Sequence, residues 1–566
     1  MHGFFGSYKA KVTWDLSGFD GKSFVKRTHS EGDFQQTQVT LPKFLNDKYF
    51  ADIDGYFLAT EGVLFEADKP EDAIARYRNG NTTFWNSWRG SFAGVLYDRK
   101  TDTLLVFNDH IGSKMLFYAQ TKEGFVFASD SYILARVLGL KPTNENFLWQ
   151  LLLYGYSPIG ETAFEGVHRL VAGEYLTIRE RHLEQHTYYR FNNTPNHLSM
   201  DQNIECIDAA FRKAVERAIR KNEEYGYSHF LPLSAGLDSR MTNRIAHDLA
   251  KTPIYNITYS QTGFFDETAP RELAEYWHNT FLFTPLDNGD CLKLLDTITC
   301  MICGIEHYSG AAETLWGLPK IAKEKAGLFL TGMVGDIIIG TGYTKCRTNQ
   351  PYHLGEGALL PYIPSKLQDS LPRNFEQLYQ NREIYYLYVR GFNCANLGSP
   401  LIHQTYGESF SPFCDVDLIE AAYSAPVQQR WGHKLYDQWI LRKYPDMARW
   451  KHNGIYTIGQ RPRIISIFGR AIAMSDIPKR MAWYILKHLH IHNYYTETKG
   501  GSMNPEDTWF KENKSLFEWS EDYIQSNLSL LNAFPELQLM VTSLSKGTAM
   551  ERMQVLTLLA CLRQAR

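Results

Sequence analysis

The sequence predicts two domains of different architecture: a layered α+β domain, followed by an α/β domain built on a parallel sheet. The chain has 566 residues, and a single hydrophobic core stops growing near ~250–300 residues. Short apolar segments separated by turns fill the first part, as in antiparallel sheets. Strands alternate with helical patterns in the later part, which favours a parallel sheet. We expect domains at 1–195 and 196–566, joined by the polar stretch 191–196, with a helical C-terminal part.

The elements expected in the first domain are mostly short strands. Helical patterns at Pro70–Arg78 and Ser131–Leu138 interrupt them. We predict strands at Val12–Trp14, Tyr56–Ala59, Gly62–Phe65, Ser91–Tyr97, Thr103–Phe107, Met115–Ala119 and Phe125–Ala128.

The second domain opens with a helical pattern over Ile204–Asn222 and an apolar strand that ends near Leu233. Strands at Ile254–Tyr259 and Thr280–Thr284 follow, with a helix from Asp266 to His278 between them. Ligands of such folds bind at the carboxyl ends of the parallel strands. We therefore expect the functional site in the loops that follow these strands.

The composition limits the kinds of partner and the cellular compartment that we expect for this protein. The formal net charge is -3, which argues against a nucleic-acid partner because binding phosphate backbones needs a basic excess. The sequence has no run of ~18 apolar residues, so we expect no membrane-spanning helix. The N-terminus lacks a signal-peptide pattern, and the eight cysteines are scattered. We expect a cytoplasmic protein in a reducing compartment.

The first candidate loop is Leu233-Ser-Ala-Gly-Leu-Asp-Ser239. Its small residues let backbone N–H groups approach a ligand, and the N-terminus of the following helix favours an anion such as phosphate. Asp238 could hold Mg²⁺, which prefers oxygen ligands and bridges phosphates. The alternative is a plain strand-to-helix connection capped by Ser and Asp.

The second candidate loop is Leu328-Phe-Leu-Thr-Gly-Met-Val-Gly-Asp336, again a strand, a glycine-containing turn and an acidic residue. A second carboxylate facing Asp238 would complete a Mg²⁺–pyrophosphate clamp. The alternative is a helix cap at Asp336. Because both loops follow predicted strands, we favour the clamp.

These motifs resemble a known family. Ser-x-Gly-x-Asp-Ser resembles the pyrophosphate (PP) loop of ATP pyrophosphatases, and Leu-Ser-x-Gly-Leu-Asp-Ser resembles that of the asparagine synthetases. Arg89–Asp98 and Leu105–Tyr118 resemble the glutaminase domain of that family. The resemblance implies an Ntn-hydrolase-like sandwich followed by an ATP pyrophosphatase domain, with ATP and Mg²⁺ as cofactors. It assigns ATP and pyrophosphate to Leu233, Ser234, Gly236, Asp238, Ser239, Ile257 and Gly332, and the metal to Asp238 and Asp336.

The sequence departs from the family at the glutaminase site. The family's nucleophile is a cysteine at position 2, and this chain has His2. The family's glutamine-binding motifs are also missing, for example where Thr60-Glu61-Gly62 replaces Asn-Gly-Glu. We predict no glutaminase activity. The alternative is His2 as a metal ligand or a new catalyst.

The second loop departs too. Met333 and Ile337 stand where the synthetases carry glutamates, the first of which is thought to deprotonate the incoming amine. The ring-closing β-lactam synthetases resemble this chain in having Asp-Ile here. The family's catalytic lysine, which stabilises charge near the α-phosphate, corresponds best to Lys451, with Lys434 as the alternative.

We therefore predict an AMP-forming ligase that adenylates a small-molecule, peptide or saccharide carboxylate and transfers it to ammonia or an amine. Two alternatives remain: an intramolecular cyclase like the β-lactam synthetases and lasso-peptide cyclases, or an inactive nucleotide- or partner-binding pseudoenzyme. Neither nucleic acid nor membrane is an expected partner, and the prediction leaves room for a homodimer. The basic, histidine-rich stretch 479–492 has no assigned role.

Overall fold

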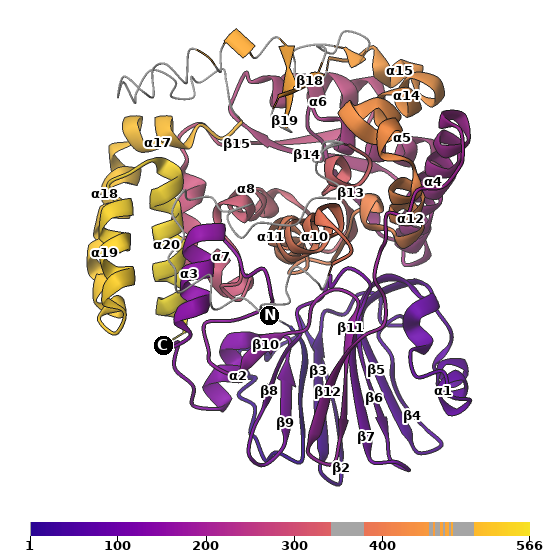
Figure 1. Ribbon diagram of the computed structural model, residues 1–566, viewed down its shortest axis with the longest axis vertical. Coiled ribbons are helices and arrows are strands. Elements are labelled where there is room, and N and C mark those ends of the chain that lie inside the picture. The colour runs from indigo at the N-terminus through magenta and orange to yellow at the C-terminus, as the bar shows by residue number, and fades with distance from the viewer. Residues whose placement is uncertain are drawn as a thin grey trace.

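The computed structural model describes residues 2–340, 379–451 and 503–565, together with 457–458, 464–467, 470–474, 477–478 and 481. Apart from Met481, the basic stretch 479–492 lies outside the described residues. Figure 1 shows a β-rich N-terminal part below a mixed α/β part, with a group of C-terminal helices at one side.

The N-terminal part is a sandwich of two antiparallel sheets with six strands each. The first sheet contains, in spatial order, β10 (Val167–Arg169), β8 (Phe117–Gln120), β9 (Phe125–Ala128), β1 (Gly3–Tyr8), β3 (Phe34–Thr40) and β2 (Val25–Glu31). The second contains β12 (His182–Thr187), β11 (Glu174–Arg179), β7 (Thr103–Asn108), β6 (Arg89–Asp98), β5 (Tyr56–Glu66) and β4 (Phe50–Ile53).

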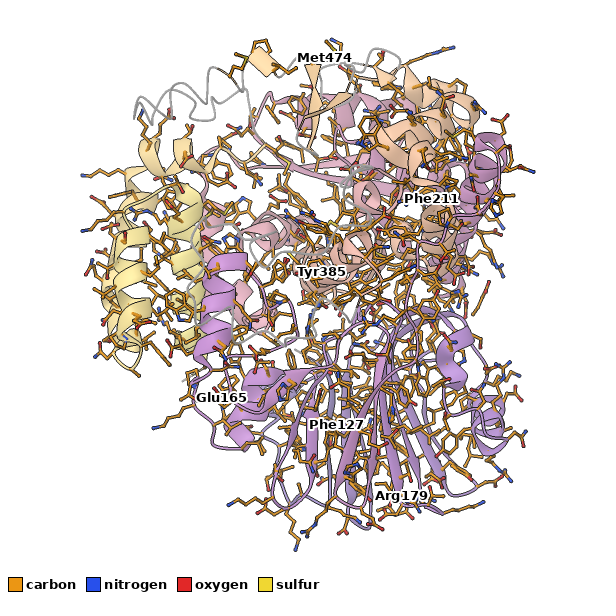
Figure 2. The ribbon with its side chains drawn as sticks, in the orientation of Figure 1. Phe127, Glu165, Arg179, Phe211, Tyr385 and Met474 are labelled. Atoms are coloured by element: carbon orange, nitrogen blue, oxygen red, sulfur yellow. The ribbon has the colours of Figure 1, made fainter. Side chains whose placement is uncertain are left out.

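Aromatic side chains fill the space between the two sheets. Phe4 and Phe127 from the first sheet join Phe57 and Val106 from the second in one buried cluster, and Figure 2 labels Phe127 within the sandwich. Alternate residues of each strand face inward, as sheet packing requires. The predicted α+β layering is therefore confirmed for this part.

The strand predictions are wrong in two places. The strands predicted at Tyr56–Ala59 and Gly62–Phe65 are one continuous strand, β5. Val12–Trp14 belongs to no sheet, and the first strand is instead β1. Lys9 follows β1 with a φ of +59°, a left-handed conformation that ends the strand. Val12 and Trp14 still pack against the core as partly buried side chains, so their apolar character reflects burial without strand pairing.

The second part contains a five-stranded sheet in the order β15 (Thr280–Pro285), β14 (Ile254–Ser260), β13 (Ser228–Pro232), β16 (Ala326–Leu330) and β17 (Glu408–Phe410). Every pairing in it is parallel, which confirms the predicted sheet. The carboxyl ends of β13, β14 and β16 therefore meet at one edge.

Helices cover both faces of this sheet, and the alternation along β13 explains why. Leu231 packs in a cluster with α4 (Met200–Glu224), α5 (Leu237–Leu249), α12 (Val416–Ser424) and α14 (Lys434–Lys443). Phe230 faces the opposite way, toward α7 (Leu295–Met301), α8 (Ser309–Gly317) and α11 (Gly398–His403). A strand buried on both faces reads as a continuous apolar run.

The C-terminal helices connect the two parts. They are α17 (Glu506–Glu512), α18 (Lys514–Asn527), α19 (Pro535–Leu544) and α20 (Ala549–Gln564). Helix α20 packs against α7 and against α3 (Glu145–Tyr154), which stands beside it in Figure 1. Its residues 553–562 are buried throughout. The predicted helical C-terminal part is present.

The remaining described elements are peripheral to these layers. They are α1 (Pro70–Arg78), α2 (Ser131–Val137), α10 (Arg382–Tyr386), α13 (Val427–Arg430), α15 (Pro445–Ala448) and the strand pair β18 (Ile464–Ile467) and β19 (Arg470–Ala473). Helix α6 (Phe265–Tyr276), in contrast, packs on β14 and β15 of the parallel sheet. Within the described part of the chain, no helix has the length and apolar character that crossing a membrane requires.

Candidate active site

A cavity of about 440 Å³ opens at the carboxyl edge of the parallel sheet. Parallel α/β sheets bind ligands at this edge. The nucleotide-binding residues suggested by the sequence all line it, as does the second acidic residue. They are Leu233, Ser234, Gly236, Asp238, Ser239, Ile257, Gly332 and Asp336.

The first loop, between β13 and α5, is held in shape by its own hydroxyls. The Ser234 N–H donates to Ser239 Oγ at 3.0 Å, and the two hydroxyl oxygens lie 2.9 Å apart. The Gly236 N–H donates to Ser234 Oγ at 3.2 Å. Outside the loop, the Ala235 N–H donates to Asp266 Oδ1 at 2.7 Å. The helix N-terminus that follows therefore faces the cavity on a fixed turn, as anion-binding loops do.

The second loop crosses the first at very close range. A Cβ added to Gly332 would lie 2.5 Å from the Ser239 nitrogen, and one added to Gly335 would lie 2.5 Å from the Asp238 carboxyl carbon. Both positions therefore require glycine. Between them, Val334 has a φ of +59°, a strained conformation for a β-branched residue. This packing brings Asp336 next to Asp238.

The Asp238 carboxylate lies at the centre of the site. The Tyr436 hydroxyl donates to Oδ1 at 2.7 Å, and the Asp336 N–H donates to Oδ2 at 2.9 Å. Burial, with the neighbouring Asp336 carboxylate, raises the pKa of Asp238 to about 7. Among the described residues, no lysine or arginine pairs with it. Two adjacent carboxylates, of which the half-buried Asp238 has no lysine or arginine partner among the described residues, fit a divalent metal ion.

Two further residues of this site were not predicted from the sequence. Tyr436 is fully buried on α14, and His433 Nε2 lies 3.3 Å from Asp336 Oδ1. Both line the cavity. Tyr436 is 198 residues from Asp238 along the chain, and neither side chain belongs to a motif. His433 precedes α14 as its N-cap, with a left-handed φ of +64°, so the two residues share no helical pattern that could have indicated them.

The far wall of the cavity carries Glu313 and His403. Burial raises the pKa of Glu313 to about 7, although the Asn504 amide donates to its Oε2 at 2.8 Å. The buried His403 ring stacks on Phe329, with centroids 4.4 Å apart, and burial lowers its pKa to about 3. The described lining of the cavity contains no lysine or arginine.

The predicted catalytic lysines do not line the described cavity. Lys451 is exposed, and Lys434 lies over the Trp431 ring at 5.9 Å. The main chain at Lys451 is nevertheless tied to the first loop. The buried Arg240 guanidinium donates to the Lys451 carbonyl at 2.7 Å and to the Ala235 carbonyl at 3.0 Å.

His2 lies away from this cavity, beside a small cavity that is also lined by Glu61 and Lys114 of the sandwich and by Gln404 of the second part. The cavity beside it measures about 10 Å³, roughly the space of one water molecule. Burial and the nearby Lys48 ammonium lower the pKa of His2 to about 3, so its imidazole is neutral. The charged side chains of Lys48, Lys114 and Glu408 lie near this imidazole.

Glu61, Lys48, Glu408 and Lys114 form a continuous row of buried ion pairs, here called the ion-pair ladder. Lys48 Nζ lies 3.3 Å from Glu61 Oε1 and 3.2 Å from Glu408 Oε1, and Lys114 pairs with the other oxygen of Glu408. All four side chains are at most 6% exposed. Burial alone would raise the pKa of Glu408, but the two ammonium groups lower it to about 2. Glu408 belongs to β17, so the ladder joins the sandwich to the parallel sheet.

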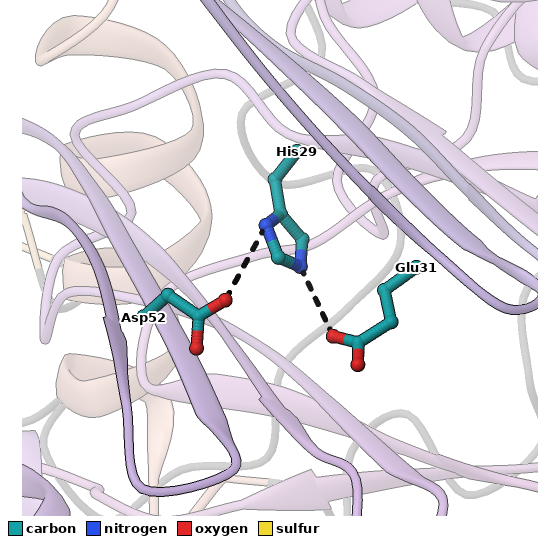
Figure 3. A group of neighbouring side chains, drawn as sticks. All are labelled: His29, Glu31 and Asp52. Carbon is teal, nitrogen blue, oxygen red and sulfur yellow. Dashed lines mark ion pairs between the residues drawn. The ribbon is translucent and has the colours of Figure 1, made fainter.

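A second group of titratable side chains lies at the outer end of the sandwich. Figure 3 shows His29 between Glu31 and Asp52, at 3.6 and 3.9 Å. This geometry could hold a metal ion, but the Arg99 guanidinium already pairs with both carboxylates. A metal ion there would have to displace that cation, so the group is best described as an ion-pair cluster.

Comparison with known proteins bears on the family. Residues 61–189 match the model of the glutamine amidotransferase domain. Asparagine synthetase [glutamine-hydrolyzing] 1 of Bacillus subtilis is 24% identical over 300 residues, which cover 51% of this chain and 45% of that protein. The chain is asparagine synthetase-like. The domain match begins at Glu61 and so leaves out the strand that follows His2.

Two fungal proteins are similar to a smaller part of this asparagine synthetase-like chain. Amidase chyE of Penicillium rubens is 28% identical over 202 residues, covering 34% of this chain and 29% of that protein. Amidase chry2 of Gibberella zeae is 28% identical over 185 residues, covering 32% and 27%. The chain therefore spans less than half the length of each curated relative named here.

Two solved structures overlap with the asparagine synthetase-like chain at low similarity. Glutamine phosphoribosylpyrophosphate amidotransferase from B. subtilis, complexed with ADP and GMP, has a TM-score of 0.20 and 11% identity, covering 46% of this chain and 67% of that one. The allosteric regulatory enzyme of purine biosynthesis has a TM-score of 0.20 and 12% identity, covering 48% and 64%. At this TM-score neither carries an argument.

Proposed function

We propose that this protein is an AMP-forming amide ligase that uses ATP and Mg²⁺ and has no glutaminase activity of its own. One observation carries the proposal: both loops identified in the sequence line the same cavity, with Asp238 and Asp336 side by side. Fixed backbone N–H groups and paired carboxylates suit a metal-bound triphosphate.

In this reaction a substrate carboxylate attacks the α-phosphorus of ATP and pyrophosphate leaves, which gives an acyl-adenylate. Ammonia or an amine then attacks the acyl carbon, AMP leaves, and the amine loses a proton. Asp238 and Asp336 would hold Mg²⁺, which supplies charge neutralisation for the leaving pyrophosphate. The loop around Ser234 would orient the phosphates, and Lys451 would stabilise negative charge on the α-phosphate.

The absence of glutaminase activity is supported by the surroundings of His2. A cavity of about 10 Å³ cannot admit the side chain of glutamine, and Glu61 and Lys114 of the ion-pair ladder line it. Nitrogen would therefore come from free ammonia or from an amine.

The test is pyrophosphate release from Mg·ATP across a panel of carboxylates, with mass spectrometry of the products. We expect AMP and pyrophosphate in equal amounts, and no turnover in Asp238→Asn. Release of ADP and phosphate would contradict the proposal. Lys443→Met is a matched control, because Lys443 lies on α14 and pairs with Glu205 at the surface.

A second candidate is a nucleotide-binding protein without turnover. Two observations favour it: the amine-activating position holds Met333, and Lys451 does not line the described cavity. Tight Mg·ATP binding without pyrophosphate release, over a panel that includes both simple carboxylates and peptides, would support this candidate.

A further inference from the structure

Arg240 joins two segments that are far apart in sequence. One Nη donates to the carbonyls of Met447 and Trp450 at 3.3 and 3.1 Å. The other donates to the carbonyls of Ala235 and Lys451 at 3.0 and 2.7 Å. One guanidinium therefore bridges the phosphate loop and a second segment, the main chain of residues 447–451.

These four contacts differ from those of an ordinary structural arginine. The side chain is 0% exposed, and in the described residues its hydrogen-bond partners are main-chain carbonyls, with no carboxylate among them. A planar fork with five N–H donors suits such a bridge, whereas a single ammonium cannot reach acceptors on both sides of it.

The bridge acts on the loop itself. Both main-chain polar groups of Ala235 are hydrogen-bonded. Its carbonyl accepts from Arg240, and its N–H donates to Asp266 Oδ1 at 2.7 Å. The residue is thus fixed from both sides, and its position sets the direction of the N–H groups that follow. Asp238 lies two residues before Arg240 on α5. Arg240 therefore couples the position of the loop to that of the carboxylate proposed to bind the metal.

We propose that Arg240 is a positioning residue that fixes the Lys451 segment against the phosphate loop. The Lys451 ammonium is thereby held at a fixed position relative to the bound nucleotide. This inference rests on the proposed function, because it takes Lys451 to reach the α-phosphate. Arg240 touches neither nucleotide nor metal in this scheme, and it acts through the main chain of the two segments it bridges.

The test measures how Mg·ATP protects Lys451 from a soluble amine-acylating reagent, read by mass spectrometry in the full-length chain. With Mg·ATP at about ten times its Kd, the unliganded fraction is roughly one eleventh, so a lysine covered in the complex reacts roughly tenfold more slowly. We expect this protection in the wild type and less than about twofold protection in Arg240→Met at the same saturation.

Arg244→Met is the matched control. Arg244 lies one turn later on α5 and also contacts the second segment, but through the Asp446 side chain at 2.8 Å. It should keep the full protection. If Arg240→Met does not fold, Arg240→Lys serves instead, because it keeps the charge but cannot span the carbonyls, and it should lose protection likewise.

The outcomes separate the two proposals. If the wild type does not bind Mg·ATP in calorimetry, the proposed function fails and this inference with it. If the wild type binds Mg·ATP but Lys451 is unprotected, the role proposed for Lys451 and this inference are both overturned, while the Mg·ATP site stands. If the Arg240 variants bind Mg·ATP and stay protected, the inference alone is overturned.

Discussion

Replacing Tyr436 by phenylalanine tests the electrostatics of the site most directly. The Tyr436 hydroxyl donates to Asp238 Oδ1 at 2.7 Å, and hydrogen bonds to charged groups contribute ~1.5–3 kcal/mol. Removing this donor disfavours the ionised carboxylate. Taking the lower end of that range, the pKa of Asp238 should rise from about 7 by roughly one unit, since one unit corresponds to ~1.4 kcal/mol.

The expected result is a shifted pH profile for Mg·ATP binding, because the metal needs the ionised carboxylate. At pH 7 the ionised fraction falls from about one half to about one eleventh, so binding weakens roughly fivefold. At pH 9 both proteins are more than about nine-tenths ionised, so the difference nearly disappears. Calorimetric titration with Mg·ATP between pH 6 and 9 measures both limits.

Tyr444→Phe is the control, because the Tyr444 hydroxyl also donates to a carboxylate, Asp208 Oδ1, at 2.7 Å, outside the cavity. It should leave the binding profile in place. Superimposable profiles for wild type and Tyr436→Phe would refute the reasoning, since Asp238 would then not control metal binding through its ionisation.

The same ionisation affects stability in the absence of metal. The folded-state pKa of Asp238 is about 7, above its ordinary value of 3.8. The folded state therefore binds a proton that the unfolded state releases, and this contribution to stability is lost as the pH rises through that window.

Three further predictions follow from close contacts. Gly335→Ala should destabilise the fold by about 1–3 kcal/mol and weaken Mg·ATP binding, because its Cβ would overlap the Asp238 carboxylate; Gly310→Ala, with open space around it, should do neither. Glu408→Gln should cost about 3–5 kcal/mol in chemical denaturation, because it takes the carboxylate partner from the buried Lys114 ammonium; adding Lys114→Met should recover part of that loss. His2→Cys should not release glutamate from glutamine, since the adjoining cavity is about 10 Å³; measurable glutamate would show that the pocket opens.

The two loops could be predicted from the sequence because their chemistry is local. Each combines a strand, small residues and an aspartate within ten positions, and such a unit folds the same way wherever it occurs. Helix α1 was expected at Pro70–Arg78 and lies there, since Pro70 begins it and acidic residues occupy its first turn.

The partners of those loops could not be predicted. Tyr436 and His433 reach the site through the packing of α14 on α4 and on residues 336–340, and the carbonyls around Arg240 through the packing of α15 on α5. No local pattern encodes this packing. The ladder at Glu408 shows the same limit. Its lysines come from two loops of the sandwich, Lys48 between β3 and β4 and Lys114 between β7 and β8. A glutamate at the start of a short strand has no pattern that indicates burial among cations.

Glu408 also determines whether the N-terminal part can be dispensed with. Cutting the chain at residue 195 would remove Lys48 and Lys114, and it would also remove α3 from the face of α20. The remainder would carry an unpaired buried carboxylate on β17, next to the strand that leads into the second loop. Removing the sandwich should therefore destabilise the parallel sheet beside the second loop, so the second part depends on the first for its stability.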